Sequence, residues 1–267
     1  MFPERKRQSG TLQSVLHSYS IIAMSQISSS TLFHFTKKKE FLQSILCEGF
    51  WPRYCIEYCW NGNHWAIPMV CFCDIPLSLI KEHIKTYGGE GWGIGMSKQW
   101  AIEQGITPVL YSSFKSDVYK LVYRFSNSLT YPSTNSKKMP LEELLLYRIK
   151  RTTASEKEQL LINGAIKRKK FYNEREWRFI PEITNDVHME KWDNSQEANK
   201  EEFCMNLSEK TKNHKLKAIP DHINYIIVPN DEKRTEILKF IKQKFDCGIQ
   251  SKLASRILTK ENILKDF

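Results

Sequence analysis

Alternating and helically spaced hydrophobic residues divide the chain into short strands and amphipathic helices. Residues 31–36 alternate, with His34 and Thr36 on one face, and are predicted to form a strand. Residues 37–49 follow, with apolar side chains at helical spacing and Gly49 as the stop signal. The ordered part of the chain is therefore predicted to open with a strand that runs directly into a helix.

The same reasoning predicts the later elements. Strands are predicted at residues 69–75, 92–96, 108–112, 171–180, 225–229 and 257–259, and helices at about 76–87, 97–105, 141–161 and 232–245. Two stretches, 51–68 and 185–213, are predicted to be mainly loop, the second with some weak helix. Short strands interspersed with helices, without an internal repeat, indicate the α+β class.

The predicted organisation is one domain behind a tail. Residues 1–23 are polar and Ser-rich and precede the patterned region, so they are predicted to be a flexible tail. Residues 24–267 are predicted to form a single domain, with a helical insertion at about 137–168. The leucine spacing there permits a partner-docking helix pair or a long core insertion.

Composition and charge narrow the class of protein. With 267 residues, 41% of them hydrophobic, the chain can bury a full core. It carries 40 basic and 30 acidic residues, a net charge of +10, which makes nucleic acid a plausible partner. The first 30 residues are too polar for a membrane span and lack a convincing cleavage site. We expect a cytoplasmic protein without a membrane partner.

The seven cysteines also favour a cytoplasmic location. Their number is odd and their spacing is not that of a disulfide framework, which favours a reducing compartment. The alternative is a zinc site built from some of Cys55, Cys59, His64, Cys71 and Cys73. That spacing is irregular, and residues 71–75 have the pattern of a buried strand, so no metal site is assigned.

Two glutamates in residues 171–180 are the strongest candidates for chemistry. On the predicted strand, Glu174, Glu176 and Arg178 share one face. Like charges about 7 Å apart must be solvated or balanced by a cation such as Arg178. The pattern is compatible with a solvated strand end that holds an internal ion pair, and with carboxylates that line a cleft.

Two family resemblances bear on this choice. His34-Phe35-Thr36, with the helix and the Gly49-Phe50 pair that follow, resembles the start of toxin and PARP-like ADP-ribosyltransferases, including the DarT group. Residues 71–78, His83, Tyr87-Gly88 and Gly93-Ile-Gly95 resemble AbiGi-type abortive-infection proteins of bacterial phage defence, and residues 174–178 complete that pattern. The match spans roughly residues 32–228 and implies an ADP-ribosyltransferase-like fold.

The resemblance implies NAD as the ADP-ribose donor. His34 would hydrogen-bond the adenosine ribose, with Phe35 and Thr36 beside it, and Tyr87 would stack on the nicotinamide. Glu176 would stabilise the oxocarbenium-like transition state, and Glu174 would orient the acceptor. The sequence allows the roles of the two glutamates to be exchanged. It also allows Trp92 or Tyr111 in place of Tyr87 as the residue that stacks on the nicotinamide.

The acceptor is predicted from charge and aromatic residues. Lysines at 37–39 and the basic run 167–170 favour a nucleic acid, and the aromatic segment 51–65 suits an unpaired base. The leading hypothesis is a toxin that transfers ADP-ribose to RNA or single-stranded DNA and is restrained by a cognate antitoxin protein. The alternatives are a non-catalytic antitoxin or nucleic-acid-binding module of an abortive-infection system, and a metal-assisted nuclease.

Overall fold

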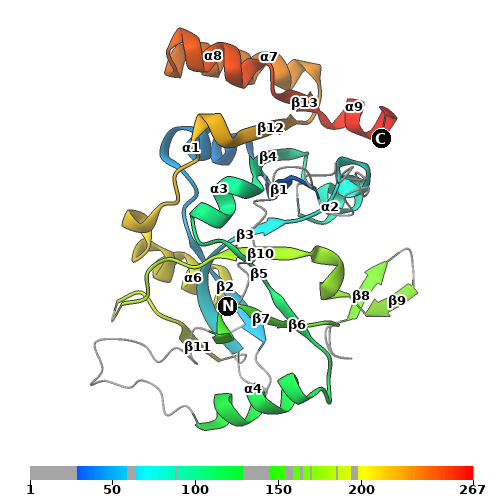
Figure 1. Cartoon of the computed structure of the whole chain (residues 1–267), viewed down its shortest axis with the longest axis vertical. Helices are drawn as coiled ribbons and strands as arrows, with labels where there is room; N and C mark the ends of the chain where they lie inside the picture. The colour runs from blue at the N-terminus through cyan, green and yellow to red at the C-terminus, as the bar shows by residue number, and fades with distance from the viewer. Residues whose placement is uncertain are drawn as a thin grey trace, which may run out of the picture.

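A computed structural model provides the three-dimensional structure (Figure 1). It describes residues 29–58, 64–87, 89–128, 145–153, 159–162, 165–168, 170–184, 186–193 and 198–266. The predicted tail, residues 1–23, lies outside these ranges, as do Cys59 and residues 137–144 of the predicted insertion.

A mostly antiparallel sheet forms the centre of the molecule. Its strand order is β13-β12-β4-β1-β3-β10-β5, and the β12–β13 pair is parallel. The strands are β1 (Thr31–Thr36), β3 (His64–Cys73), β4 (Trp92–Ser97), β5 (Thr107–Pro108), β10 (Glu176–Phe179), β12 (Ile223–Val228) and β13 (Ile257–Thr259). Neighbouring strands are often distant in sequence, so the sheet depends on long-range pairing.

Strand β3 connects this sheet to two further strands. Its first half pairs with β2 (Arg53–Tyr58) and β11 (Glu190–Trp192), and its second half pairs with β1 and β10. Side chains from Trp65 to Val70 are buried on both faces, which explains the continuous apolar run. The prediction of a loop at residues 51–68 is therefore wrong for β2 and the start of β3.

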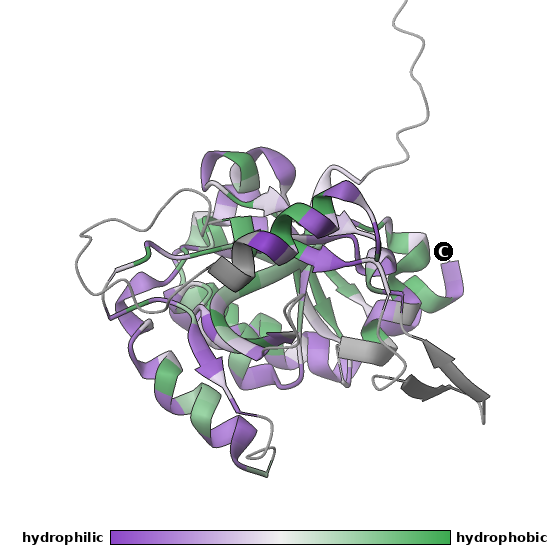
Figure 2. Cartoon of the chain, turned by 90° about the horizontal axis from the view of Figure 1, so that it is seen from below, coloured by the Kyte–Doolittle hydropathy of each residue, from purple (hydrophilic) through white to green (hydrophobic). Residues whose placement is uncertain are grey.

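Helices pack around the sheet and at its ends. They are α1 (Lys39–Glu48), α2 (Ile80–Tyr87), α3 (Lys98–Glu103), α4 (Asp117–Ser128), α6 (Lys200–Glu209), α7 (Asp231–Lys244), α8 (Cys247–Ala254) and α9 (Lys260–Asp266). Short 3-10 turns lie at η1 (Leu77–Leu79), η3 (Phe171–Glu174), η5 (Lys212–His214) and η6 (Pro220–His222). In Figure 1, α7 and α8 lie at one end and α4 at the other. Purple and green alternate along the helices in Figure 2, as expected for amphipathic helices.

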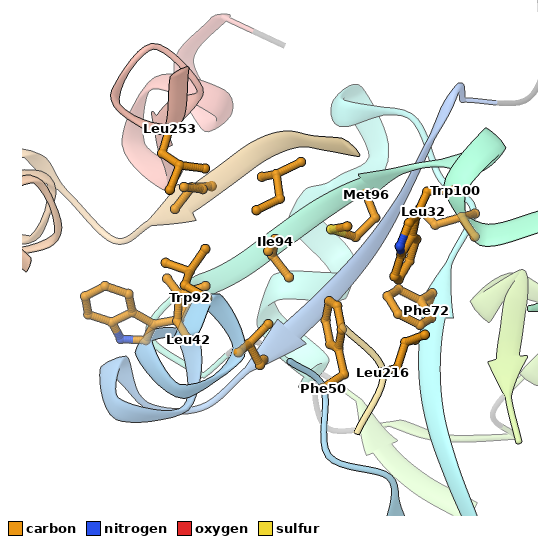
Figure 3. Close-up of a cluster of buried hydrophobic side chains, with 14 of the residues drawn as sticks. Leu32, Leu42, Phe50, Phe72, Trp92, Ile94, Met96, Trp100, Leu216 and Leu253 are labelled. Carbon is orange, nitrogen blue, oxygen red and sulfur yellow. The ribbon is translucent and has the colours of Figure 1, made fainter. Parts of the chain in front are cut away.

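The largest hydrophobic core lies between the central sheet and its covering helices (Figure 3). Leu32, Phe72 and Ile94 contribute from the sheet, Leu42 from α1 and Trp100 from α3, and all of these side chains are buried. Helix α1 ends where predicted, because Gly49 adopts a positive φ of 94° and its N–H donates to the Ile45 carbonyl oxygen.

The α+β class is confirmed, and the helical insertion is corrected in its described part. Strand β7 (Ile149–Arg151) pairs with β6 (Leu110–Ser112), and β8 (Gln159–Ile162) pairs with β9 (Ala165–Arg168). Residues 149–151, 159–162 and 165–168 are thus strand and not helix. Leucine spacing alone predicted the helix, whereas β7 pairs with the distant strand β6 and β8 pairs with β9, which follows it directly in sequence.

Candidate functional site

The two candidate glutamates lie on either side of a backbone bend. Residues 171–174 form the 3-10 turn η3, Arg175 adopts a left-handed conformation (φ 44°, ψ 48°), and β10 begins at Glu176. The prediction of one continuous strand over residues 171–180 is therefore wrong. A left-handed non-glycine residue costs roughly 1–2 kcal/mol. The Arg175 carbonyl accepts a hydrogen bond from the Asp74 N–H at 3.0 Å, which holds the bend.

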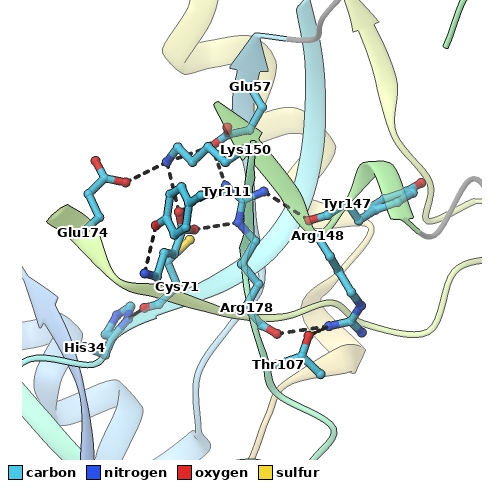
Figure 4. A network of polar contacts seen from close by, with 11 residues as sticks. His34, Glu57, Cys71, Thr107, Tyr111, Tyr147, Arg148, Lys150, Glu174 and Arg178 are labelled. Atoms are coloured by element: carbon cyan, nitrogen blue, oxygen red, sulfur yellow. Dashed lines mark hydrogen bonds and ion pairs between the residues drawn. The ribbon is translucent and has the colours of Figure 1, made fainter. Parts of the chain in front are cut away.

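Arg178 is the buried centre of the site (Figure 4). Its side chain is 0% exposed and binds Glu176 in a bidentate manner, Nε to Oε1 at 2.6 Å and Nη2 to Oε2 at 3.2 Å. Its Nη2 also lies 3.0 Å from Glu57 Oε1, and Nη1 donates to the Tyr147 carbonyl oxygen at 3.1 Å. The prediction that Arg178 balances the glutamate charge is confirmed.

Lys150 on β7 supplies the second cation. Its Nζ lies 2.8 Å from Glu174 Oε2, 3.0 Å from Glu176 Oε2 and 3.7 Å from Glu57 Oε1. Burial by itself would lower the pKa of Lys150, but the three carboxylates hold it above its ordinary value. These three carboxylates and two cations form what we call the ion network, with a net charge of −1.

Glu176 is ionised and fully engaged within the ion network. Burial by itself would raise its pKa, but Arg178 and Lys150 outweigh that effect and lower it to about 2. Its backbone N–H donates to the Tyr111 hydroxyl at 3.0 Å, and the thiol of the half-buried Cys71 also bonds its side chain. The carboxylate of Glu176, 6% exposed, is thus an anchor for cations in this structure.

His34 has a different environment. Its ring lies edge-on to Phe50, with centroids 5.3 Å apart, and 5.7 Å from the Phe72 centroid. Nδ1 lies 2.8 Å from the Cys71 carbonyl oxygen, which can only accept, so Nδ1 carries the proton. Burial lowers the pKa of His34, which favours the neutral ring.

Strand register separates His34 from Glu176. Cys73 on β3 is the register partner of Phe33 on β1 and of Glu176 on β10. Directly paired residues point to the same face of a sheet, and neighbours along a strand point to opposite faces. Glu176 therefore shares a face with Phe33, whereas His34 lies on the other face, against Phe72. The structure brings together the two glutamates but not the histidine.

The other predicted NAD contacts lie in β1, at the end of α2 and in two other elements. Phe35 is half-buried and stacks on Phe33 with centroids 6.2 Å apart, and Thr36 is buried at the end of β1. Tyr87 is the last residue of α2, and its side chain lies outside the described part. Trp92 is a core residue, and the Tyr111 ring lies against Tyr172 with centroids 5.4 Å apart.

Two members of the ion network were missed in the sequence. Glu57 lay in a segment predicted to be loop, and Lys150 lay in one predicted to be helix. The alternation in residues 53–58 was the available signal for a strand, although it would place Glu57 on the more polar face with Arg53 and Cys55. Nothing in the local sequence indicated that Lys150 would meet the glutamates, because that contact depends on the pairing of β7 with β6.

The aromatic segment is not a free stacking platform in its described part. Trp65 is buried, and Trp51 donates Nε1 to the Ser208 carbonyl and to Thr211 Oγ1, both at 3.0 Å. The Arg53 guanidinium covers the Trp51 ring at 3.3 Å. Both tryptophans hold the protein's own structure, so the prediction that this segment stacks an unpaired base is not supported by them.

The described residues contain neither a metal-binding cluster nor a membrane-spanning helix. No group of three or more His, Cys, Asp or Glu side chains is arranged to hold a metal ion among the described residues. Likewise, no helix in the described ranges is both long and apolar enough to cross a membrane.

Comparisons with known proteins identify relatives for most of the chain. The family model described as "Putative abortive phage resistance protein AbiGi, antitoxin" matches residues 48–229. The "Abortive phage resistance protein AbiGi" of Lactococcus lactis subsp. cremoris is 26% identical over 252 residues, covering 82% of this chain and 100% of that protein. No solved structure matches the chain significantly.

Proposed function

The chain belongs to the AbiGi family of abortive phage resistance proteins, and we propose that it is the non-catalytic antitoxin of such a system, which binds a toxin protein and restrains it. The family description names an antitoxin, and the relative's name places that protein in abortive phage resistance. The role in phage defence follows from the family. The antitoxin role rests on the ion network as well.

The observation that carries the proposal is the engaged carboxylate of Glu176. A transferase glutamate must accept a hydrogen bond from the ribose of NAD and stabilise the positive charge that develops there. Here both oxygens of Glu176 already bind Arg178, and Oε2 also binds Lys150. Breaking a buried ion pair costs about 3–5 kcal/mol. His34 on the opposite face of the sheet does not fit a shared NAD site, so no NAD-dependent step is assigned to these residues.

The first test is an NAD assay. Purified protein and the Glu176→Gln variant are incubated with labelled NAD and with RNA, single-stranded DNA or total cell protein. We expect no release of nicotinamide and no transfer of label in either sample. Transfer by the unmodified protein that disappears in Glu176→Gln would overturn the proposal.

The second test addresses restraint. The chain is expressed in a bacterial host alone and together with the products of the genes that flank its own. We expect normal growth with the chain alone, and relief of the growth arrest caused by one flanking product, which is then the toxin. Growth arrest by this chain alone, relieved by a neighbour, would reverse the assignment.

A second candidate is a cytoplasmic NAD-dependent mono-ADP-ribosyltransferase that modifies RNA or single-stranded DNA under the control of an antitoxin. The observation in its favour is that the carboxylates of Glu174 and Glu176 converge on the single ammonium of Lys150, at 2.8 and 3.0 Å. The net charge of +10 also suits a nucleic-acid acceptor. The NAD assay separates this candidate from the antitoxin, because only the transferase consumes NAD.

A further inference from the structure

Helix α4 presents an exposed apolar stripe. Phe114, Val118 and Leu121 are 70%, 40% and 64% exposed. Their spacing of four and three residues places them on one side of the helix and of the turn that leads into it. We call these three residues the α4 stripe. Single exposed apolar residues are ordinary on a protein surface, but a row of them on one helix face is typical of an interaction site.

The helix beneath the stripe is anchored. Val122 on α4 is buried against the cluster that contains Leu146 and Tyr147. At its N-terminal end, the Tyr119 N–H donates to Ser116 Oγ at 3.0 Å. The α4 stripe is therefore displayed by an element that is fixed through the adjacent side of the helix, since Val122 lies four residues after Val118 and one after Leu121.

The charges along α4 define the chemistry of a partner. Lys115, Lys120 and Arg124 are exposed along it, and Asp117 is the acidic residue among them, 2.8 Å from Lys120. Three basic residues against one acidic residue give this segment a net charge of +2, the same sign as the whole chain. A complementary surface is apolar at its centre and acidic at its rim.

We propose that the α4 stripe is the docking surface for the toxin, and that the toxin covers it with an amphipathic helix. The apolar side chains of that helix would lie on Phe114, Val118 and Leu121, and its acidic side chains would face Lys115 and Arg124. Two amphipathic helices packed face to face bury both apolar surfaces and pair the opposite charges at their rims. This inference rests on the proposed antitoxin function.

The experiment uses the full chain and the toxin identified by relief of growth arrest. Binding is measured by titration calorimetry for the unmodified protein, Leu121→Asp and Arg124→Glu. The matched control is Ile102→Asp on α3, which replaces an equally exposed residue (61%) on another surface. We expect Leu121→Asp to weaken the Kd by about tenfold or more. For Arg124→Glu we expect a smaller loss that fades at high salt, and for Ile102→Asp no change.

The same variants separate the two proposals and the other possible occupants. A toxin that binds Leu121→Asp as tightly as it binds Ile102→Asp overturns the docking surface and leaves the antitoxin function standing. Failure to find any relieved toxin contradicts the antitoxin function itself. Sedimentation of the isolated protein as a dimer that Leu121→Asp dissociates would assign the stripe to a second copy. A fall in melting temperature without a change in Kd would assign it to the chain's own packing, and either result overturns the inference.

Discussion

Replacing Arg178 with methionine tests whether the ion network acts as a structural anchor. Methionine keeps an apolar stem of similar length and removes the guanidinium. Glu176 then loses both contacts to Arg178, at 2.6 and 3.2 Å, and retains Lys150 at 3.0 Å. Glu57 loses its contact at 3.0 Å and is left with Lys150 at 3.7 Å. Three buried or half-buried carboxylates would share one cation.

The expected loss of stability is large. Removing one partner of a buried ion pair typically costs about 3–5 kcal/mol, because the remaining charge is uncompensated. For a chain of this size, each kcal/mol lowers the melting temperature by roughly 2–4 °C. Arg178→Met should therefore melt roughly 6–20 °C below the unmodified protein. Adding Glu176→Gln removes one of the unpaired charges, so the double variant should lose less than the sum of the single variants.

Thermal unfolding followed by circular dichroism, with urea unfolding as a second probe, measures this loss. Arg234→Met is the matched control, because Arg234 binds the exposed Asp231 on the surface of α7 at 2.8 Å. Exposed pairs of that kind contribute about 0–1 kcal/mol. If Arg178→Met and Arg234→Met were destabilised equally, or if the double variant showed full additivity, the reasoning about the ion network would be refuted.

Three further predictions concern titration, thiol reactivity and a backbone position. The pKa of Glu176 is about 2 in the folded protein and 4.5 ordinarily, so its stabilising contribution is present above pH 4.5 and is lost as the pH falls towards 2. The melting temperature of Glu176→Gln should therefore change less between pH 4.5 and pH 2 than that of the unmodified protein. Burial raises the pKa of Cys71, so mass spectrometry after iodoacetamide at pH 8 should find the exposed Cys247 alkylated at least about tenfold faster. A Cβ on Gly49 would lie 2.5 Å from a backbone oxygen, whereas a Cβ on Gly105, which also has a positive φ, would meet nothing within 4 Å. Urea unfolding should therefore show that Gly49→Ala is destabilised more than Gly105→Ala.

The local hydrophobic pattern was sufficient to predict those helices and strands whose limits depend on their own side chains. Strand β1 and helix α1 could be predicted because alternation gives way to helical spacing within a few residues and Gly49 supplies the stop. Helix α7 followed equally from its apolar spacing, and Asn230 caps it by accepting from the Lys233 N–H at 3.0 Å. These elements need little information from elsewhere in the chain.

The site could be predicted only in part, because its geometry depends on distant segments. Glu176 and Arg178 share a strand face as expected, since both lie within β10. The bend at Arg175 could not be read from the sequence, because a non-glycine residue is left-handed there only through the surrounding contacts. The separation of His34 from Glu176 depends on the register of β1 and β10 against β3. That register cannot be predicted from the spacing of residues along the chain.

The ion network also anchors the strand pair β6–β7, and β6 leads into α4. Lys150 is the register partner of Tyr111, and the Tyr111 hydroxyl accepts the Glu176 N–H, so β6 and β7 are tied to β10 on two sides. Helix α4 begins five residues after β6 ends, within reach of that anchorage. Glu174 and Glu176, which look catalytic in sequence, therefore act with Glu57 to hold a strand pair that leads into a helix at the surface. Buried charges that define one arrangement of segments in this way suit the proposed role of presenting a fixed surface to a partner.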